Sequence, residues 1–152
     1  VLGFLYLISG DALTNGDLDE PFDGHFPATE RMVDQLVQPA ELPPWLTEDD
    51  VDFYVEEISR TGFRGGLNWY RNIYRMPGAL APWVGATIEN PTFYMGGSTD
   101  LIAGNTPEAI ATMQSALPDL RHCELIDGAG HWLQQERPEA VNQALLAFLG
   151  GL

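Results

Sequence analysis

Two loops that follow predicted strands carry side chains suited to proton transfer. The loop GGSTD at residues 96–100 ends in Asp100, and the loop DGAGH at residues 127–131 ends in His131. A carboxylate that orients an imidazole, which then acts as a general base, forms half of a catalytic triad. Parallel strands present their carboxyl ends at one edge of a sheet, so we expect Asp100 and His131 to be hydrogen-bonded neighbours. Asp127 is a competing carboxylate, but its place at a strand end is more typical of a turn.

A phenol is the third candidate for chemistry. Tyr70 lies in the stretch GFRGGLNWYRN at residues 62–72. With an ordinary pKa near 10, a tyrosine can donate a proton or a hydrogen bond to a developing alkoxide. The opening of a strained ether ring requires such a donor. The alternative is a half-buried tyrosine that only packs against its neighbours.

Other reactive residue types lack a comparable context. His25 and His122 are expected to be surface or structural residues, and Cys123 to be a packed structural thiol. No spacing of His, Cys, Asp and Glu resembles a metal site, so no metal is expected. What the sequence lacks is a candidate nucleophile for such a triad.

The charge balance restricts the class of partner. The chain of 152 residues has 7 Lys and Arg against 22 Asp and Glu, a formal net charge of −15. Binding to nucleic acid or to an anionic membrane surface needs clustered basic residues, so both partners are excluded. No apolar run is long enough to span a membrane. One cysteine allows no intramolecular disulfide, which fits a reducing compartment and suggests a cytoplasmic location.

The first part of the chain is predicted to be helical. Residues 1–9 suggest a buried helix that has lost its beginning, residues 10–26 a long polar connector, and residues 28–37 a further helix. The clearest helix begins at Thr47, which can cap the amides that follow, and ends at Gly62. A second helix is expected over residues 67–74, and residues 76–84 are expected to be irregular.

The second part has the alternation of an α/β fold. Strands are predicted at residues 91–97 and 121–126, with helices at residues 109–116 and from Pro138 onward. Strand, helix, strand and helix at this spacing indicate parallel strands. We therefore expect two domains, a helical segment over residues 1–85 and an α/β segment over residues 86–152.

Several of these stretches resemble one family, the epoxide hydrolases of the α/β-hydrolase fold. The cap-domain motif of that family is similar to GFRGGLNWYRN at residues 62–72, although the family usually has proline where Gly66 stands. The preceding cap helix resembles PWLTEDDVDFY at residues 44–54. The segment with the family's catalytic histidine resembles GAGHWLQQERPE at residues 128–139, and residues 92–102 resemble the strand and loop with its catalytic acid.

The resemblance implies a role for each matching residue. Tyr70 would be one of two cap tyrosines that polarise the epoxide oxygen, Asp100 the acid that orients the histidine, and His131 the base that activates water. The candidate pocket wall consists of apolar side chains. These are Trp69, Leu101, Ile102, Trp132 and Leu133.

The departures from the family pattern define what this chain would lack. The family's nucleophilic aspartate, oxyanion loop and second cap tyrosine have no counterpart here, so the chain resembles a C-terminal half: the later cap and the last two core strands with their helices. The resemblance implies an enzyme that opens a small hydrophobic epoxide to a vicinal diol through an aspartyl ester, with water as co-substrate and without a cofactor. This chain alone is expected to be inactive and to need the N-terminal half. A homodimer, a haloalkane dehalogenase-like hydrolase and a non-catalytic fragment or binding module stay open as alternatives.

Overall fold

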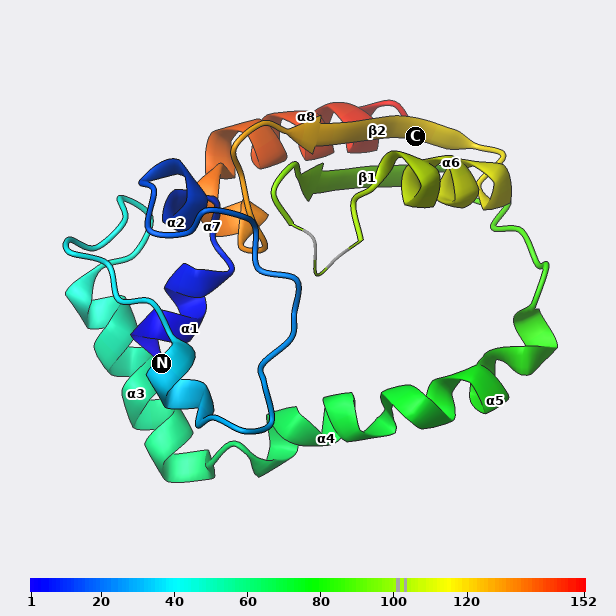
Figure 1. Ribbon diagram of the computed structural model, residues 1–152. Coiled ribbons are helices and arrows are strands. Elements are labelled where there is room, and N and C mark those ends of the chain that lie inside the picture. Colours follow the sequence, from blue (N-terminus) through cyan, green and yellow to red (C-terminus); the bar gives the residue numbers. More distant parts are fainter. Residues whose placement is uncertain (101, 103) are drawn as a thin grey trace.

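The computed structural model describes residues 1–100, 102 and 104–152, and its elements fall into two groups (Figure 1). A pair of strands with flanking helices lies at one side, and a curved row of helices from α3 to α5 lies at the other (Figure 1). In the described part of the chain, no helix is both long and apolar enough to cross a membrane.

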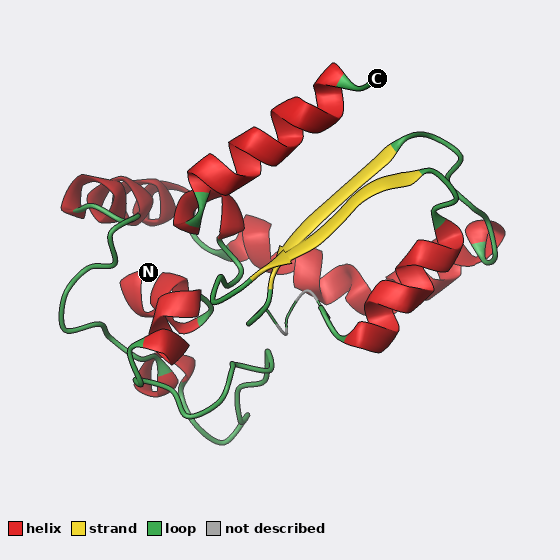
Figure 2. Ribbon diagram, turned by 90° about the horizontal axis from the view of Figure 1, so that it is seen from above, coloured by secondary structure: helices red, strands yellow, loops and turns green. Residues whose placement is uncertain are grey.

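The predicted parallel strands are confirmed. Strand β1 (Thr92–Gly97) pairs in parallel with β2 (Leu120–Ile126), and Gly97 lies opposite Ile126 at their carboxyl ends. Helix α6 (Pro107–Ala116) connects them and lies on one side of the pair, while α8 (Pro138–Gly150) lies on the other (Figure 2). The Phe148 ring of α8 lies 5.5 Å from Phe93 of β1, and Gln114 of α6 reaches Cys123 of β2. This arrangement brings the loops after both strands to the same edge.

Local capping signals explain where the predicted helices begin. The Thr106 side chain accepts a hydrogen bond from the Ala109 amide at 3.2 Å at the start of α6. Pro138 occupies the first turn of α8, where its missing N–H costs nothing. A short helix, α7 (Leu133–Glu136), precedes α8 and was not expected from the sequence.

The clearest predicted helix is also confirmed. Helix α3 (Glu48–Thr61) starts with a capping box, in which Thr47 and Asp50 each accept a hydrogen bond from the backbone amide of the other. The hydrogen bonds from the Thr47 side chain and backbone lower the pKa of the Asp50 carboxyl. Gly62 ends the helix with a φ of 69°, which favours glycine.

The rest of this row is more regular than expected. Helix α4 (Arg64–Asn72) begins three residues earlier than predicted and continues into a 3₁₀ turn, Ile73–Arg75. The prediction that residues 76–84 are irregular was wrong, because α5 (Met76–Leu80) and a 3₁₀ turn (Ala81–Trp83) occupy all of them except Val84. Each proline in these two elements occupies one of the first two positions, where it does not interrupt helical hydrogen bonding.

The first residues form the buried helix that the sequence predicts. Helix α1 (Leu2–Leu7) buries Leu5, Tyr6 and Leu7. The Tyr6 hydroxyl donates to the Asp17 carboxylate at 2.6 Å, and burial, with this hydrogen bond, raises the pKa of the Tyr6 phenol. The structure thus uses a buried phenol to hold the segment that follows α1.

Two predictions for the following segment need correction. Residues 10–26 are not connector throughout, because α2 (Gly10–Thr14) occupies their beginning. The helix predicted at residues 28–37 was wrong, and only a 3₁₀ turn forms there, Met32–Gln35. Met32 and Val33 are both exposed, so the apolar pattern that suggested this helix has no core to face.

Candidate active site

Asp100 and His131 lie together at the carboxyl edge of the two strands. The distance from His131 Nδ1 to Asp100 Oδ2 is 3.0 Å, which confirms the expected hydrogen bond. The Asp100 side chain is 8% exposed and the His131 side chain 35%. An ionised carboxylate only accepts hydrogen bonds, so Nδ1 carries the proton and Nε2 is left with a lone pair. The pair can therefore accept a proton at Nε2 of His131.

Asp127 is not the carboxylate that orients the histidine. It faces the Ser98 hydroxyl at 3.5 Å, a marginal hydrogen-bond distance. The turn that contains Asp127 is held by Ser98 itself, whose hydroxyl accepts a hydrogen bond from the Gly128 amide at 3.0 Å. This geometry agrees with the expectation of a turn-forming aspartate.

The two loops are joined to each other next to the Asp–His pair. Both the amide and the hydroxyl of Thr99 donate to the Ala129 carbonyl, at 3.1 and 2.8 Å. Gly97 allows the loops this close, because a Cβ at that position would lie 2.2 Å from the Ala129 oxygen and 2.4 Å from the Gly130 oxygen. The loop with Asp100 and the loop with His131 therefore form one unit.

Gly97→Ala is expected to lower the free energy of unfolding by about 1–3 kcal/mol, because the added methyl group forces two backbone segments apart. Gly65→Ala is the matched control, since a Cβ there meets nothing within 4 Å and alanine favours α4 by about 1 kcal/mol over glycine. Urea denaturation followed by circular dichroism compares the two variants. A midpoint for Gly97→Ala equal to that of Gly65→Ala would contradict the close approach of the loops.

The beginning of the chain supports the histidine loop. The His131 amide donates to the Ile8 carbonyl at 2.9 Å, and the Trp132 indole N–H donates to the Leu5 carbonyl at 2.8 Å. The Trp132 ring stands nearly perpendicular to the imidazole, at a centroid distance of 5.2 Å. Leu5 and Ile8, which lie more than 120 positions earlier in the chain, thus hold the backbone and the indole beside the imidazole of His131.

A second polar network steadies the loop that contains Asp100. The Tyr94 hydroxyl on β1 donates to the Asn105 side-chain oxygen, and the Asn105 amide group donates to the Gly97 carbonyl at 3.0 Å. Burial raises the pKa of the Tyr94 phenol, and the negative charge of Asp100 raises it further. This phenol therefore stays protonated and keeps its hydrogen bond at neutral pH.

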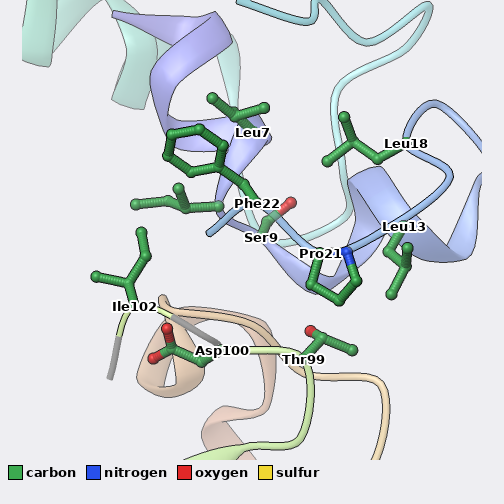
Figure 3. Close-up of a pocket in the computed structure, with 10 residues that line it drawn as sticks. Leu7, Ser9, Leu13, Leu18, Pro21, Phe22, Thr99, Asp100 and Ile102 are labelled. Atoms are coloured by element: carbon green, nitrogen blue, oxygen red, sulfur yellow. The ribbon is translucent and has the colours of Figure 1, made fainter. Parts of the chain in front are cut away.

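A small recess opens beside Asp100 (Figure 3). Its internal space is about 10 Å³, enough for one water molecule. Apart from Ser9, Thr99 and Asp100, its lining is apolar: Leu7, Ile8, Leu13, Leu18, Pro21, Phe22 and Ile102. Ile102 is thus the predicted pocket residue that lines the recess, and Leu101 lies outside the described residues.

The other predicted pocket residues lie apart from this recess. Trp132 is half-buried beside His131, Leu133 is buried, and Trp69 on α4 is highly exposed. Tyr70, also on α4, is 62% exposed, and within the described residues its hydroxyl makes no hydrogen bond. The structure therefore brings Asp100 and His131 together, but it does not bring Tyr70 to them.

The other two histidines, His25 and His122, lie away from the Asp100–His131 pair in contact with other side chains. His25 is exposed and next to Asp23, and the His122 ring stacks on Phe93 at a centroid distance of 4.7 Å. In the described ranges, no three His, Cys, Asp or Glu side chains are arranged to hold a metal ion.

Sequence reasoning missed two residues that surround the pair. Asn105 is buried and bonds to Gly97 in the Asp100 loop, and Glu136 in α7 is buried and bonds to the amides on either side of His131. A glutamate in a helical, polar stretch is ordinarily exposed, so nothing in its sequence context predicted burial. An uncompensated buried carboxylate is unfavourable, and Glu136 is compensated by hydrogen bonds from three backbone amides.

Comparison with known proteins places the chain among epoxide hydrolases. No family model matches it. Epoxide hydrolase A of Mycobacterium tuberculosis is 44% identical over 83% of this chain and 38% of its own length. Epoxide hydrolase B of the same species is 36% identical over 100% of this chain and 48% of its own length.

Solved structures agree with this relationship. An epoxide hydrolase from an endophytic Streptomyces superimposes with a TM-score of 0.86 at 37% identity, over 99% of this chain and 44% of that one. Epoxide hydrolase A from Mycobacterium thermoresistibile gives a TM-score of 0.74 at 36% identity, over 100% of this chain and 53% of that one. The chain thus spans about half the length of the proteins that it matches or less. By sequence and by fold, it belongs to the epoxide hydrolases of the α/β-hydrolase fold and corresponds to a C-terminal segment of them.

Proposed function

We propose that this chain supplies the base, its acid partner and a cap phenol of an epoxide hydrolase. The observation that carries the proposal is the 3.0 Å hydrogen bond between Asp100 and His131 at the carboxyl edge of two parallel strands. The relatives named epoxide hydrolases support the type of reaction. The proposed substrates are a small hydrophobic epoxide and water, which suits the apolar lining beside Asp100.

The first step in this proposal is ring opening by an aspartate that lies outside this chain. One oxygen of its carboxylate forms a bond to an epoxide carbon, and the carbon–oxygen bond of the ring breaks. The Tyr70 hydroxyl donates its hydrogen bond or proton to the oxygen that leaves, which stabilises the developing alkoxide. The product of this step is an ester of the aspartate with a free hydroxyl on the neighbouring carbon.

The second step is hydrolysis of that ester, for which His131 is the base. Its Nε2 takes a proton from water while the water oxygen attacks the ester carbonyl. When the ester bond breaks, the imidazolium returns that proton to the leaving oxygen, which releases a vicinal diol and restores the carboxyl group of the aspartate. Asp100 holds the Nδ1–H tautomer and stabilises the imidazolium that forms. These steps use side chains and water alone.

The preceding half of the fold is the proposed partner within the protein. Residues 1–85 would form the later part of a cap and residues 86–152 the end of the core, although residues 5–10 contact the histidine loop of the core. Helices α3, α4 and α5 have no buried residue, and their exposed apolar side chains offer a surface to that half. These include Phe53, Val55, Leu67, Trp69 and Leu80. In that assembly Tyr70 would face the edge that contains Asp100 and His131.

The test is complementation of this chain by the N-terminal half of an epoxide hydrolase. The chain is purified alone and also co-expressed with that half of epoxide hydrolase B from Mycobacterium tuberculosis, and diol formation from styrene oxide is followed by chromatography. We expect the chain alone to give only the buffer rate and the complex to form diol, because the nucleophile comes from the partner half. His131→Ala should abolish turnover by the complex. His25→Ala is the matched control, because its side chain is 87% exposed and far along the chain from the pair.

Three outcomes would contradict the proposal. A folded complex that forms no diol would favour a non-catalytic binding module. Release of halide from a chloroalkane without opening of the epoxide would favour a dehalogenase. Turnover by the chain alone that is lost in His131→Ala would show that no partner half is needed.

A further inference from the structure

A single buried carboxylate holds the backbone on both sides of His131. Glu136 Oε2 accepts hydrogen bonds from the amides of Gly10 at 3.0 Å and Gly130 at 2.8 Å, and its Oε1 accepts one from the Trp132 amide at 3.0 Å. The residue is 7% exposed. Its charge is thus compensated by three backbone donors from two separate segments.

These contacts leave the backbone of the histidine loop little freedom. The amides of Gly130 and Trp132 donate hydrogen bonds to Glu136. The His131 amide, which lies between them, donates to the Ile8 carbonyl. Every amide from residue 130 to residue 132 therefore has a partner. The third donor is the Gly10 amide, which belongs to the same segment as Ile8. The Glu136 side chain therefore binds both the histidine loop and the N-terminal segment that packs against it.

The two backbone segments that donate to this carboxylate are in close contact with each other. A Cβ at Gly130 would lie 2.4 Å from the Gly10 nitrogen and 2.5 Å from the Ser9 carbonyl carbon. The two segments therefore meet backbone to backbone, and their amides point at one acceptor. Only a side chain with acceptors at both terminal atoms satisfies all three donors, which glutamate does and glutamine does not.

We propose that Glu136 is a positioning residue for His131, which holds the imidazole so that Nδ1 stays on Asp100 and Nε2 faces the ester. The kinetic part of this proposal rests on the proposed function, but the geometric part does not. A misplacement of about 1 Å at a reacting group can cost on the order of 10²-fold in rate. Hydrolysis of the ester should therefore depend on Glu136 although this residue touches no substrate.

The first readout needs no activity. Glu136→Gln keeps the shape of the side chain but turns one of its two acceptors into a donor. In the ¹⁵N-labelled 152-residue chain, we expect exchange of the His131 Nδ1 proton with water to accelerate at least tenfold. Glu139→Gln is the matched control, because Glu139 lies three residues away, is exposed and belongs to the first turn of α8, and it should leave this exchange unchanged. An Nδ1 proton that exchanges equally slowly in both variants would overturn the proposal.

The second readout separates positioning from stability. In the complemented protein, Glu136→Gln should slow ester hydrolysis by about 10–100-fold and change ester formation much less. A lower denaturation midpoint with unchanged rates would assign Glu136 a structural role only and overturn the proposal. If the complemented wild-type protein forms no diol, the proposed function fails, whereas the proton-exchange result still decides the role of Glu136.

If Glu136→Gln does not fold, Glu136→Asp tests the same role of Glu136 with a smaller change to the side chain. Glu136→Asp retains two acceptors but is one methylene shorter, so it cannot reach all three amides at once. We expect native circular dichroism with faster exchange of the His131 Nδ1 proton than in Glu139→Asp. Equal exchange in the two folded aspartate variants would overturn the proposal.

Discussion

Replacement of His131 by glutamine is expected to stop the reaction after ring opening and to leave the ester in place. Glutamine keeps a polar side chain of similar reach but has no nitrogen that accepts a proton at neutral pH. A positioned general base contributes about 10²–10⁴-fold, so ester hydrolysis should slow by that order in the complemented protein. Ring opening does not use the Nε2 lone pair and should proceed at nearly the wild-type rate.

Mass spectrometry of the partner half measures this prediction directly. After one equivalent of styrene oxide, the His131→Gln protein should show the partner half with the mass of one added epoxide, and this adduct should persist. His25→Gln serves as the control, since His25 is exposed, and it should show no lasting adduct. The assignment of His131 as the base would be refuted by an adduct that disappears at the wild-type rate.

Replacement of Tyr70 by phenylalanine is expected to act on the other step. The substitution keeps the ring of a residue that is 62% exposed and removes only its hydroxyl, which makes no hydrogen bond within the described residues. The loss of one donor to a developing oxyanion typically costs on the order of 10²–10³-fold, so formation of the ester should slow by up to that factor. A second tyrosine in the partner half would reduce the loss. Hydrolysis of ester already formed depends on His131 and should change much less.

Single-turnover kinetics separates the two steps for this variant. Tyr74→Phe is the matched control, because Tyr74 follows one turn later in the same row of helices and is 92% exposed. It should leave both steps unchanged. If Tyr70→Phe slowed hydrolysis and not ester formation, Tyr70 would not be the donor to the epoxide oxygen, and the stretch around it would serve packing alone.

The sequence by itself determined the elements whose signals are local. Thr47 and Asp50 cap α3 and Gly62 ends it, while Pro138 starts α8, and each signal acts over one or two helical turns. The parallel pairing of β1 and β2 followed from the alternation of strand and helix. The meeting of Asp100 and His131 followed in turn, because loops after parallel strands share one edge.

The local sequence pattern gave wrong predictions of secondary structure in two situations. In one, a predicted helix has no tertiary contact to support it, and in the other, a tertiary contact accompanies a helix that the pattern does not predict. The apolar residues at 28–37 suggested a helix, but Met32 and Val33 are exposed and only a 3₁₀ turn forms. A short isolated helix gains too little from its own hydrogen bonds to offset the cost of nucleation. In contrast, α2 forms within a polar stretch, where Asp11 accepts the Trp45 indole hydrogen bond at 2.7 Å.

Only the tertiary structure decided what holds His131. Ile8 and Gly10 lie about 120 positions before the histidine loop. Ile8 accepts the hydrogen bond of the His131 amide, and Glu136 joins Gly10 to Gly130. No period or spacing reports such a contact, since it depends on how two distant segments meet. A carboxylate that looks solvent-exposed in the sequence becomes buried because three backbone amides converge on it.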